Sequence, residues 1–485
     1  MTPRSRRRGT YGRCPRALAA VLVAVLTLGA CDGAGDGGSQ ATGQPADNGA
    51  AEGDIVVASG RDVTGKGGVR QKLIEQWNRQ QEDTGSSFRA RLVELPGSAD
   101  QQRSQLLGAL QSGSAEYDVV NLDVTWVPEF ADAGLVQQLP DDLVDADVIP
   151  SVAATASWGG KLYAAPFNSD VGLLFYRRDY LKNAGVTNTE LGKGTEWSTV
   201  QQLIDTMGDA GRSAQSGYEK GWTTQLAPYE GLTVNGIESF ASAVDGLRLT
   251  DGAGQYTGSV QDLEAGLKEL RDRTNAPYTL GDASRSAEAE SLGDFADGRT
   301  AFLRHWPYAY RSLHQSLNDQ QLGVAPLPGR AVLGGQNLAV TKASKRGTAA
   351  KALIRFLTGR DSERCLLDEG FAATRLSAYN DNGLTCATDK PAAPSATASP
   401  SPSPTSSAES TDRMPRDKQG RPAYARDTLL PALQNAVQRP RTPLYGAFTQ
   451  TFTTELRRLY ADKPPSELQL AKDLHAKLQR ALPHT

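Results

Sequence analysis

The sequence is poor in the residues that most often build metal sites. Only four histidines and four cysteines occur among its 485 residues. The histidines are His305, His314, His475 and His484. They form no ligand cluster, and the cysteines do not have the spacing of a zinc motif. We therefore expect no metal centre of the His/Cys kind, and no cofactor.

A surplus of positive charge is also lacking. The formal net charge is −3, and six of the arginines lie within the first 30 residues, which contain no acidic residue. A chain without those residues would carry a net charge of −9. Because the phosphates of nucleic acids require a basic surface, we expect no nucleic-acid partner.

The most common signature of secreted α/β hydrolases, a Gly-x-Ser-x-Gly turn, does not occur. Carboxylates such as Asp123, Asp170 and Glu230 could still form the acid pair of a glycoside hydrolase, whose two carboxyl groups lie a fixed distance apart. A secreted glycoside hydrolase therefore stays an alternative.

The N-terminus has the organisation of an export signal. Arginines between positions 4 and 16 precede an apolar stretch from Ala17 to Ala30, and the stretch closes as Leu28-Gly29-Ala30-Cys31. Basic residues, a short apolar core and small residues are typical of a secretory signal. The stretch of about 14 residues is shorter than the roughly 20 that a membrane-spanning helix needs.

A cysteine directly after Leu-x-Ala resembles a bacterial lipobox. In that interpretation residues 1–30 are a lipoprotein signal peptide, and Cys31 carries lipid as the first residue of the mature protein. The protein would then be anchored at the outer face of the cell membrane, as in Gram-positive bacteria. The alternative is an ordinary signal peptide followed by an incidental cysteine.

Two cysteines remain once the export signal is set aside. Cys14 lies in the signal and Cys31 is the expected lipid site, which leaves Cys365 and Cys386. Exported proteins meet an oxidising environment, so an even pair of thiols predicts a disulfide between Cys365 and Cys386.

Two stretches contain few apolar residues that could form a core. Residues 31–53 are rich in Gly, Ala, Asp and Gln, and indicate a flexible tether. Residues 388–421 include a run of Ser, Pro, Ala and Thr, after which periodic apolar segments resume. We expect a disordered surface insertion there, with an O-glycosylated or partner-binding segment as the alternative.

Strand and helix patterns alternate from residue 54 onward. Strands are expected at 54–59, 88–95 and 117–122, and helices around 69–77 and 101–110. Further helices are expected around 350–357, 448–460 and 471–478. Strands separated by helices in this way join as parallel neighbours through right-handed crossovers. The expected fold class is α/β.

The loop after the first strand resembles a phosphate-binding loop only in part. It reads Gly60-Arg-Asp-Val-Thr-Gly65-Lys66, but Gly67 stands where Ser or Thr should hold magnesium. A nucleotide site is therefore not expected. The loop still follows a parallel strand, where open α/β sheets bind ligands, so Arg61 and Asp62 are candidate ligand contacts.

Aromatic residues recur beside polar residues in the predicted loops. The stretches are Asp123-Val-Thr-Trp126, Tyr163-Ala-Ala-Pro-Phe-Asn168-Ser-Asp170, Trp222, Tyr229-Glu230-Gly-Leu232 and His305-Trp306-Pro-Tyr308. Sugars stack their C–H faces on aromatic rings and offer hydroxyl groups to carboxylates, amides and Arg. Any one of these rings could equally pack in a core; the set as a whole favours a sugar-binding cleft.

Further short stretches, taken in their order along the chain, form a pattern together with those above. They are Val93-Glu-Leu-Pro-Gly97, Tyr117-Asp-Val-Val-Asn-Leu-Asp-Val-Thr-Trp126, Gly160-Lys-Leu-Tyr-Ala-Ala-Pro-Phe-Asn-Ser-Asp170, Gly334-Gly-Gln-Asn-Leu-Ala-Val340 and Arg441-Thr-Pro-Leu-Tyr445. With Trp306-Pro-Tyr308, this order resembles an extracellular solute-binding protein of a carbohydrate-uptake ABC transporter. The trehalose- and maltose-type binding lipoproteins are the nearest likeness.

The resemblance implies a two-lobed periplasmic-binding-protein-like fold, with a sugar bound between the lobes. The implied ranges are 54–166 for lobe 1, 167–330 for lobe 2, 331–358 for a return to lobe 1, and 359–485 for C-terminal helices of lobe 2. The family's usual sugar contacts match Asp123, Asp170, Trp306, Tyr308, Gly335 and Arg375. Candidate contacts from the residues themselves add Trp126, Asn168, Tyr229 and Glu230.

Two positions depart from the family pattern. Gln336 follows the Gly-Gly pair where an aromatic residue is common, and Thr374 precedes Arg375 where Pro is usual. Gln336 is included among the candidate contacts, and neither trehalose nor maltose is assumed.

The implied function is capture of a di- or oligosaccharide and its delivery to a membrane permease, by a monomer without enzymatic activity. A sugar sensor coupled to a signalling partner is a further alternative.

Overall fold

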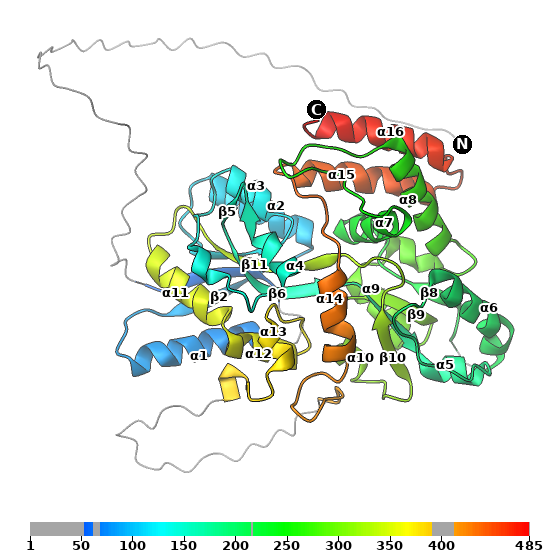
Figure 1. Ribbon diagram of the computed structural model, residues 1–485, viewed down its shortest axis with the longest axis horizontal. Helices are drawn as coiled ribbons and strands as arrows, with labels where there is room; N and C mark the ends of the chain where they lie inside the picture. Colours follow the sequence, from blue (N-terminus) through cyan, green and yellow to red (C-terminus); the bar gives the residue numbers. More distant parts are fainter. Residues whose placement is uncertain (1–52, 62–67, 215–216, 390–411, 485) are drawn as a thin grey trace, which may run out of the picture. The chain divides into compact units, whose positions relative to one another are not determined.

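Two β-sheets organise residues 53–61, 68–214, 217–389 and 412–484, the part of the chain that the computed structural model describes (Figure 1). The first sheet has the strand order β2-β1-β3-β11-β6 and the second the order β10-β7-β9-β8. The expected α/β class is confirmed. The expected export signal, Cys31, the tether up to residue 52 and Asp62 lie outside the described residues.

The first sheet begins as the sequence predicts. Its strands are β1 (Ile55–Gly60), β2 (Ala90–Leu95), β3 (Val119–Asp123), β6 (Ala165–Val171) and β11 (Leu333–Val340). β1 pairs in parallel with β2 and β3, whereas β11 runs antiparallel to β3 and β6. Helices α1 (Val69–Asp83) and α2 (Ala99–Gln111) supply the predicted crossovers.

Both faces of this sheet are covered, which explains why β1 is apolar throughout. Ile55 and Val57 pack in one core with α1, α11 (Gly347–Leu357) and α12 (Arg360–Asp368). Val56 and Ala58 pack in another core with α2 and α3 (Val127–Asp132). Successive strand residues point to opposite faces, so a continuous β-branched run is what a sheet buried on both sides requires.

The second sheet is built in the same way. It contains β7 (Leu173–Arg177), β8 (Lys220–Thr223), β9 (Thr300–His305) and β10 (Leu322–Pro326). Leu173 and Phe175 face a core with α9 (Glu288–Ala296), α10 (Ala309–Leu313) and α14 (Leu430–Asn435). Leu174 and Tyr176 face a core with α5 (Arg178–Asn183) and α6 (Trp197–Ala214).

Four helices from distant parts of the chain pack together beside these sheets (Figure 1). They are α7 (Glu230–Ala243), α8 (Val260–Arg273), α15 (Tyr445–Leu456) and α16 (Glu467–Ala481). Phe240, Phe448 and Phe452 join their apolar faces. The helix expected to reach Tyr460 ends at Leu456 and continues as a 3₁₀ turn, Arg457–Tyr460. The remaining short elements are α4 (Pro150–Ala153), α13 (Leu376–Asn380) and the hairpin of β4 (Ser157–Trp158) and β5 (Lys161–Leu162).

Two segments connect strands of one sheet to strands of the other, and a third runs beside one of them; we call all three the crossing segments. The first is Gly172, between β6 and β7, and the second is residues 327–332, between β10 and β11. The third is residues 436–444, between α14 and α15, where Val437 hydrogen-bonds to Ala331 and Leu333. β6 stays in the first sheet up to Val171, beyond the expected lobe boundary at residue 166, because Val171 still pairs with Leu333.

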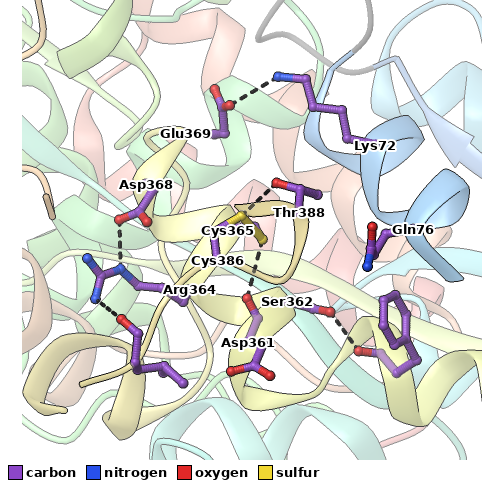
Figure 2. The surroundings of a disulfide bond; sticks show 12 residues. Lys72, Gln76, Asp361, Ser362, Arg364, Cys365, Asp368, Glu369, Cys386 and Thr388 are labelled. Carbon is purple, nitrogen blue, oxygen red and sulfur yellow. Dashed lines mark hydrogen bonds and ion pairs between the residues drawn. A yellow bond between two sulfur atoms is a disulfide. The ribbon is translucent and has the colours of Figure 1, made fainter. Parts of the chain in front are cut away.

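The disulfide between Cys365 and Cys386 is confirmed, and it joins α12 to the turn Ala387–Asp389 (Figure 2). Both cysteines are buried in the core shared with α1 and α11. This packing places α12 against the first sheet, whereas the expected ranges assign residues 359–485 to the second lobe.

The two ends of the expected insertion belong to the folded body. Arg364 donates to the carbonyl of Leu384 on one side (2.9 Å) and to the carbonyl of Gln419 on the other. Arg421 is fully buried and donates to the Tyr379 carbonyl and to Asp417 (2.7 Å). Residues 388–389 and 412–421 therefore differ from the expected disordered stretch, because these arginines fix both flanks. Residues 390–411 lie outside the described residues.

No helix within these described ranges has the length and apolar character that crossing a membrane requires. The same residues contain no cluster of three or more His, Cys, Asp or Glu side chains that could hold a metal ion.

Replacing both cysteines, as in Cys365→Ala/Cys386→Ala, should lower the free energy of unfolding by about 3 kcal/mol. The disulfide closes a loop with a sequence separation of 21, and the loss is the loop-closure entropy regained by the unfolded chain. Urea titrations of wild type and variant, each with and without reductant, measure this. Reductant should bring the wild type to the variant's midpoint; identical midpoints without reductant would contradict the expectation.

Candidate functional site

Three predicted residues lie side by side across the first sheet. The strand register pairs Gln336 of β11 with Asp123 of β3 on one side and with Asn168 of β6 on the other. The next pairs along β11 and β6 are Gly335 with Ser169 and Gly334 with Asp170. This row lies where β3 ends, so polar side chains collect at the carboxyl edge of a parallel strand pair.

Arg70 organises one part of this edge. Its guanidinium donates to the Ser59 hydroxyl (3.1 Å), the Gly60 carbonyl (2.8 Å), the Asn168 amide oxygen (3.3 Å) and the Gln336 amide oxygen (2.8 Å). Arg70 is a buried residue in the first turn of α1. Because the planar guanidinium of Arg70 bonds to residues of three strands, the Asn168 and Gln336 side chains have fixed orientations.

Gly335 is required by the backbone at this point. Its φ is +116°, and a Cβ atom there would lie 2.4 Å from the carbonyl oxygen of Asn168. Gly334 beside it is less confined, since a Cβ there would come within 3.1 Å of the Asp170 side chain and 3.3 Å of the Trp306 ring. The two glycines allow the aromatic ring to approach the carboxylate-bearing strand closely.

Asp170 is the least satisfied carboxylate of the site. Its Oδ1 atom is buried and accepts no hydrogen bond from the described residues. Burial raises the pKa of Asp170 to about 7, an effect that Arg70 opposes and that the charge of Asp123 supports. A buried acceptor without a donor is a position where a ligand hydroxyl would form a favourable hydrogen bond.

Two aromatic residues lie near this carboxylate, and a third lies near Tyr308. Trp306 follows β9, and the Arg304 guanidinium carbon lies 3.8 Å from its ring centroid. Tyr308 contacts His305 edge to face, and burial raises its pKa, with Glu288 and Asp170 adding to the shift. Tyr229 ends in a buried hydroxyl, and burial raises its pKa well above the usual value, with the charge of Glu288 adding to the shift.

Arg439 joins strand β3 to helix α7 through what we call the Arg439 network. Its guanidinium donates to both oxygens of Asp123 (2.9 and 3.1 Å) and to Glu230 (2.6 Å). Glu230 also accepts from Tyr445 and Thr449 (2.8 Å) of α15. Burial raises the pKa of Glu230, although the positive charge of Arg439 opposes this.

The other predicted contacts lie elsewhere. Arg61 is exposed after β1. Trp126 is buried in a core at the start of α3, and Trp222 packs edge to face on Trp197. The predicted sugar donor Arg375 donates instead to Asp145 (2.8 Å) and the Thr358 carbonyl (2.6 Å).

The predictions missed three buried arginines, Arg70, Arg304 and Arg439. All three are buried, and buried arginines are rare unless they are paired. A sequence signal for such a residue is an arginine directly after apolar strand residues, as in Phe302-Leu-Arg304. Its partners could not be identified because they lie far away along the chain.

A pocket of about 570 Å³ lies against the third crossing segment, and Arg439 of the Arg439 network is among its lining residues. It is lined by Trp158, Gly159, Ile237, Leu249, Gln438 and Arg441, among others. None of the predicted ligand contacts lines it.

The chain is similar to proteins of one family. The model of the family described as bacterial extracellular solute-binding protein matches residues 64–363, more than half of the chain. A probable ABC transporter-binding protein of Deinococcus radiodurans is 29% identical over 319 residues, which are 62% of this chain and 72% of that relative. The sn-glycerol-3-phosphate-binding periplasmic protein UgpB of Salmonella typhimurium is 25% identical over 226 residues, 45% of this chain and 49% of that relative.

Solved structures agree with the fold. Maltose-bound MalE3 of T. maritima aligns with a TM-score of 0.69 at 23% identity, covering 88% of this chain and 100% of that chain. UgpB of Mycobacterium tuberculosis in complex with glycerophosphocholine aligns with a TM-score of 0.65 at 18% identity, covering 89% and 98%. The expected two-lobed periplasmic-binding-protein-like fold is confirmed.

Asp170 should make stability depend on pH. Its folded-state pKa of about 7 lies above the ordinary value of 3.8, so the folded protein binds the proton more tightly than the unfolded chain does. The free energy of unfolding should therefore fall as the pH rises from about 4 to about 7. Asp170→Asn should remove this dependence. Urea titrations from pH 4 to 8 measure the difference, with Asp132→Asn, an exposed carboxyl, as the charge control. If the difference in the free energy of unfolding between Asp170→Asn and wild type does not change with pH, this expectation is wrong.

Arg439→Met should destabilise the protein by about 3–5 kcal/mol, because it leaves the buried Glu230 without its cation. Adding Glu230→Gln to that variant should recover part of the loss. Arg330→Met removes an exposed ion pair with Asp245 and should cost no more than about 1 kcal/mol. Equal losses for Arg439→Met and Arg330→Met in urea titrations would refute a central role for the Arg439 network.

Proposed function

Because the chain belongs to the bacterial extracellular solute-binding proteins, we propose that it captures a carbohydrate between its two lobes and delivers it to the permease of an ABC importer. The ligand class is a di- or oligosaccharide. The protein acts as a monomer, held at the outer face of the membrane by lipid on Cys31.

One observation carries the choice of ligand. The half-buried Trp306 ring and the Cβ atom of Asp170 both lie close to Gly334, and Oδ1 of Asp170 accepts no hydrogen bond from the described residues. An aromatic face adjoining a buried acceptor is complementary to a sugar ring, whose C–H groups stack while a hydroxyl donates.

The site uses residues of both lobes, which supports binding by closure. Asp170 and Asn168 come from the first sheet, whereas Trp306 and Tyr308 follow β9 of the second. A ligand that contacts both sets binds best when the lobes are closed, so it shifts an open–closed equilibrium. The lobes would move as rigid bodies about the crossing segments. We propose Gly172 and residues 327–332 as the lobe boundaries.

Asp123 and Glu230 have a different part in this proposal. Both are committed to Arg439, although Oδ2 of Asp123 accepts only one hydrogen bond from the described residues and can still accept another from a sugar hydroxyl. Their main contribution is to join strand β3 to helix α7. Arg375 is left out of the proposed contacts because its donors are engaged elsewhere.

Thermal-shift screening against mono-, di- and oligosaccharides should identify a stabilising ligand, because binding to the native state alone raises the melting temperature. For that sugar, Trp306→Ala should weaken binding about 30-fold or more, and Asp170→Asn roughly 10- to 100-fold. Calorimetry measures both affinities. Tyr278→Ala, which removes a ring whose hydroxyl donates to the exposed Asp205 (3.2 Å), is the control and should bind as wild type does.

Other outcomes of the same screen oppose the proposal. If glycerol phosphates stabilise the protein and no sugar does, the ligand class is glycerol phosphates and not carbohydrates. Release of reducing sugar during long incubation would favour the glycoside hydrolase alternative. Unchanged affinity in Trp306→Ala would show that the binding site lies elsewhere.

A further inference from the structure

A buried ion pair lies behind Trp306. Arg304 of β9 and Glu238 of α7 are paired through two hydrogen bonds, Nε to Oε2 (3.0 Å) and Nη2 to Oε1 (2.6 Å). Both side chains are only 2% exposed. A guanidinium bound at two points by a carboxylate has little freedom to rotate, and neither charge has water as an alternative partner.

Glu238 contacts two of the three crossing segments. Its Oε1 atom accepts a hydrogen bond from the backbone N–H of Val332 (3.1 Å). Gly172 lies so close that a Cβ atom there would be 2.3 Å from the same oxygen and 2.9 Å from Nη2 of Arg304. The ion pair therefore packs directly against both strand-to-strand connections between the lobes.

Arg304 contacts the proposed sugar-stacking ring. Its guanidinium carbon lies 3.8 Å from the Trp306 centroid, which is cation–π geometry. Since Arg304 covers one face of the ring, a sugar can stack only on the other face. The edge of the ring approaches Gly334 of β11, so any displacement of Arg304 would change how the ring faces the first lobe.

We propose that Arg304 and Glu238 are positioning residues that couple the orientation of Trp306 to the crossing segments. Movement at Gly172 or Val332 displaces the Glu238 carboxylate, the carboxylate carries Arg304 with it, and Arg304 shifts the ring. Closure of the lobes and presentation of the stacking face then occur together. This inference rests on the proposed carbohydrate-binding function and adds to it a mechanical link that involves no direct contact with sugar.

A purely structural role would affect stability alone, so the test follows Trp306 itself in the absence of ligand. The Trp306 contribution is the difference in emission and acrylamide quenching between each protein and the same protein carrying Trp306→Phe. Glu238→Gln keeps the shape of the side chain and removes its charge, and Gly172→Ala displaces the pair from the crossing segment. Both should change the Trp306 contribution in protein that remains folded at the temperature of measurement.

Arg177→Lys is the matched control. Arg177 is also buried, bound at two points by Asp179 (2.8 and 2.6 Å), and placed over an aromatic ring, Tyr180 at 4.0 Å, but it contacts no crossing segment. It should cost stability without altering Trp306. Arg304→Lys should be more stable than Arg304→Met, because it keeps a positive charge beside Glu238. It should not restore the wild-type Trp306 contribution, because an ammonium group lacks the flat face of a guanidinium.

Affinity for the sugar found by screening completes the test. Gly172→Ala should weaken binding about tenfold in the wild-type background and hardly at all in Trp306→Ala, since its effect acts through the ring. Additive losses, or an unchanged Trp306 contribution in both Glu238→Gln and Gly172→Ala, would overturn the coupling. If no sugar binds the wild type, the proposed function fails, while the ligand-free measurements still decide whether the pair positions Trp306.

Discussion

The Arg439 network is the interaction on which the arrangement of the candidate site depends. A guanidinium that is almost completely removed from water must be neutralised, and its two carboxylates come from different layers of the molecule. Asp123 ends a strand of the first sheet, and Glu230 begins the helix that packs on α8 and α15. With the cation between them, the end of β3 and the start of α7 are held together. The aromatic residues and Asp170 are therefore arranged around a fixed polar centre.

The same principle recurs in the other buried arginines. Arg70 aligns the side chains at the edge of the first sheet, and Arg304 lies beneath Trp306. Buried charges cost much free energy unless every donor has a partner, so each guanidinium restricts the conformations of its neighbours. Oδ1 of Asp170, by contrast, is buried and accepts no hydrogen bond from the described residues.

Much of the fold was predictable because it depends on local patterns. The β-branched run after Asp54 forms β1, and the helical spacing of Val69, Leu73 and Trp77 forms the buried face of α1. The pairing of Cys365 with Cys386 was predictable because the other two cysteines belong to the expected export signal and its lipid site. The resemblance to a known family added the two-lobed arrangement, which no local pattern contains.

The site was predictable only in part. Trp126 and Trp306 both lie between a strand and a short helix, yet Trp126 is a core residue and Trp306 lies close to Gly334 and Asp170. The difference depends on residues far along the chain. Arg70 is 266 positions from Gln336, and Arg439 is 316 positions from Asp123. Arg375 shows the converse: a family position that matches in sequence but whose donors are taken by Asp145 and a backbone carbonyl.

The contacts that hold the two flanks of the Ser/Pro-rich stretch do not depend on the chain being continuous between them. Arg364 binds backbone on both sides of the stretch, Arg421 binds Tyr379 across it, and the disulfide fixes the residues that lead into it. Each flank is thus tied to the body independently of the covalent path between them. The two polypeptides produced by a single proteolytic cut there would remain associated as one folded body. New chain termini, or an inserted domain, could be introduced at this position without rebuilding either lobe.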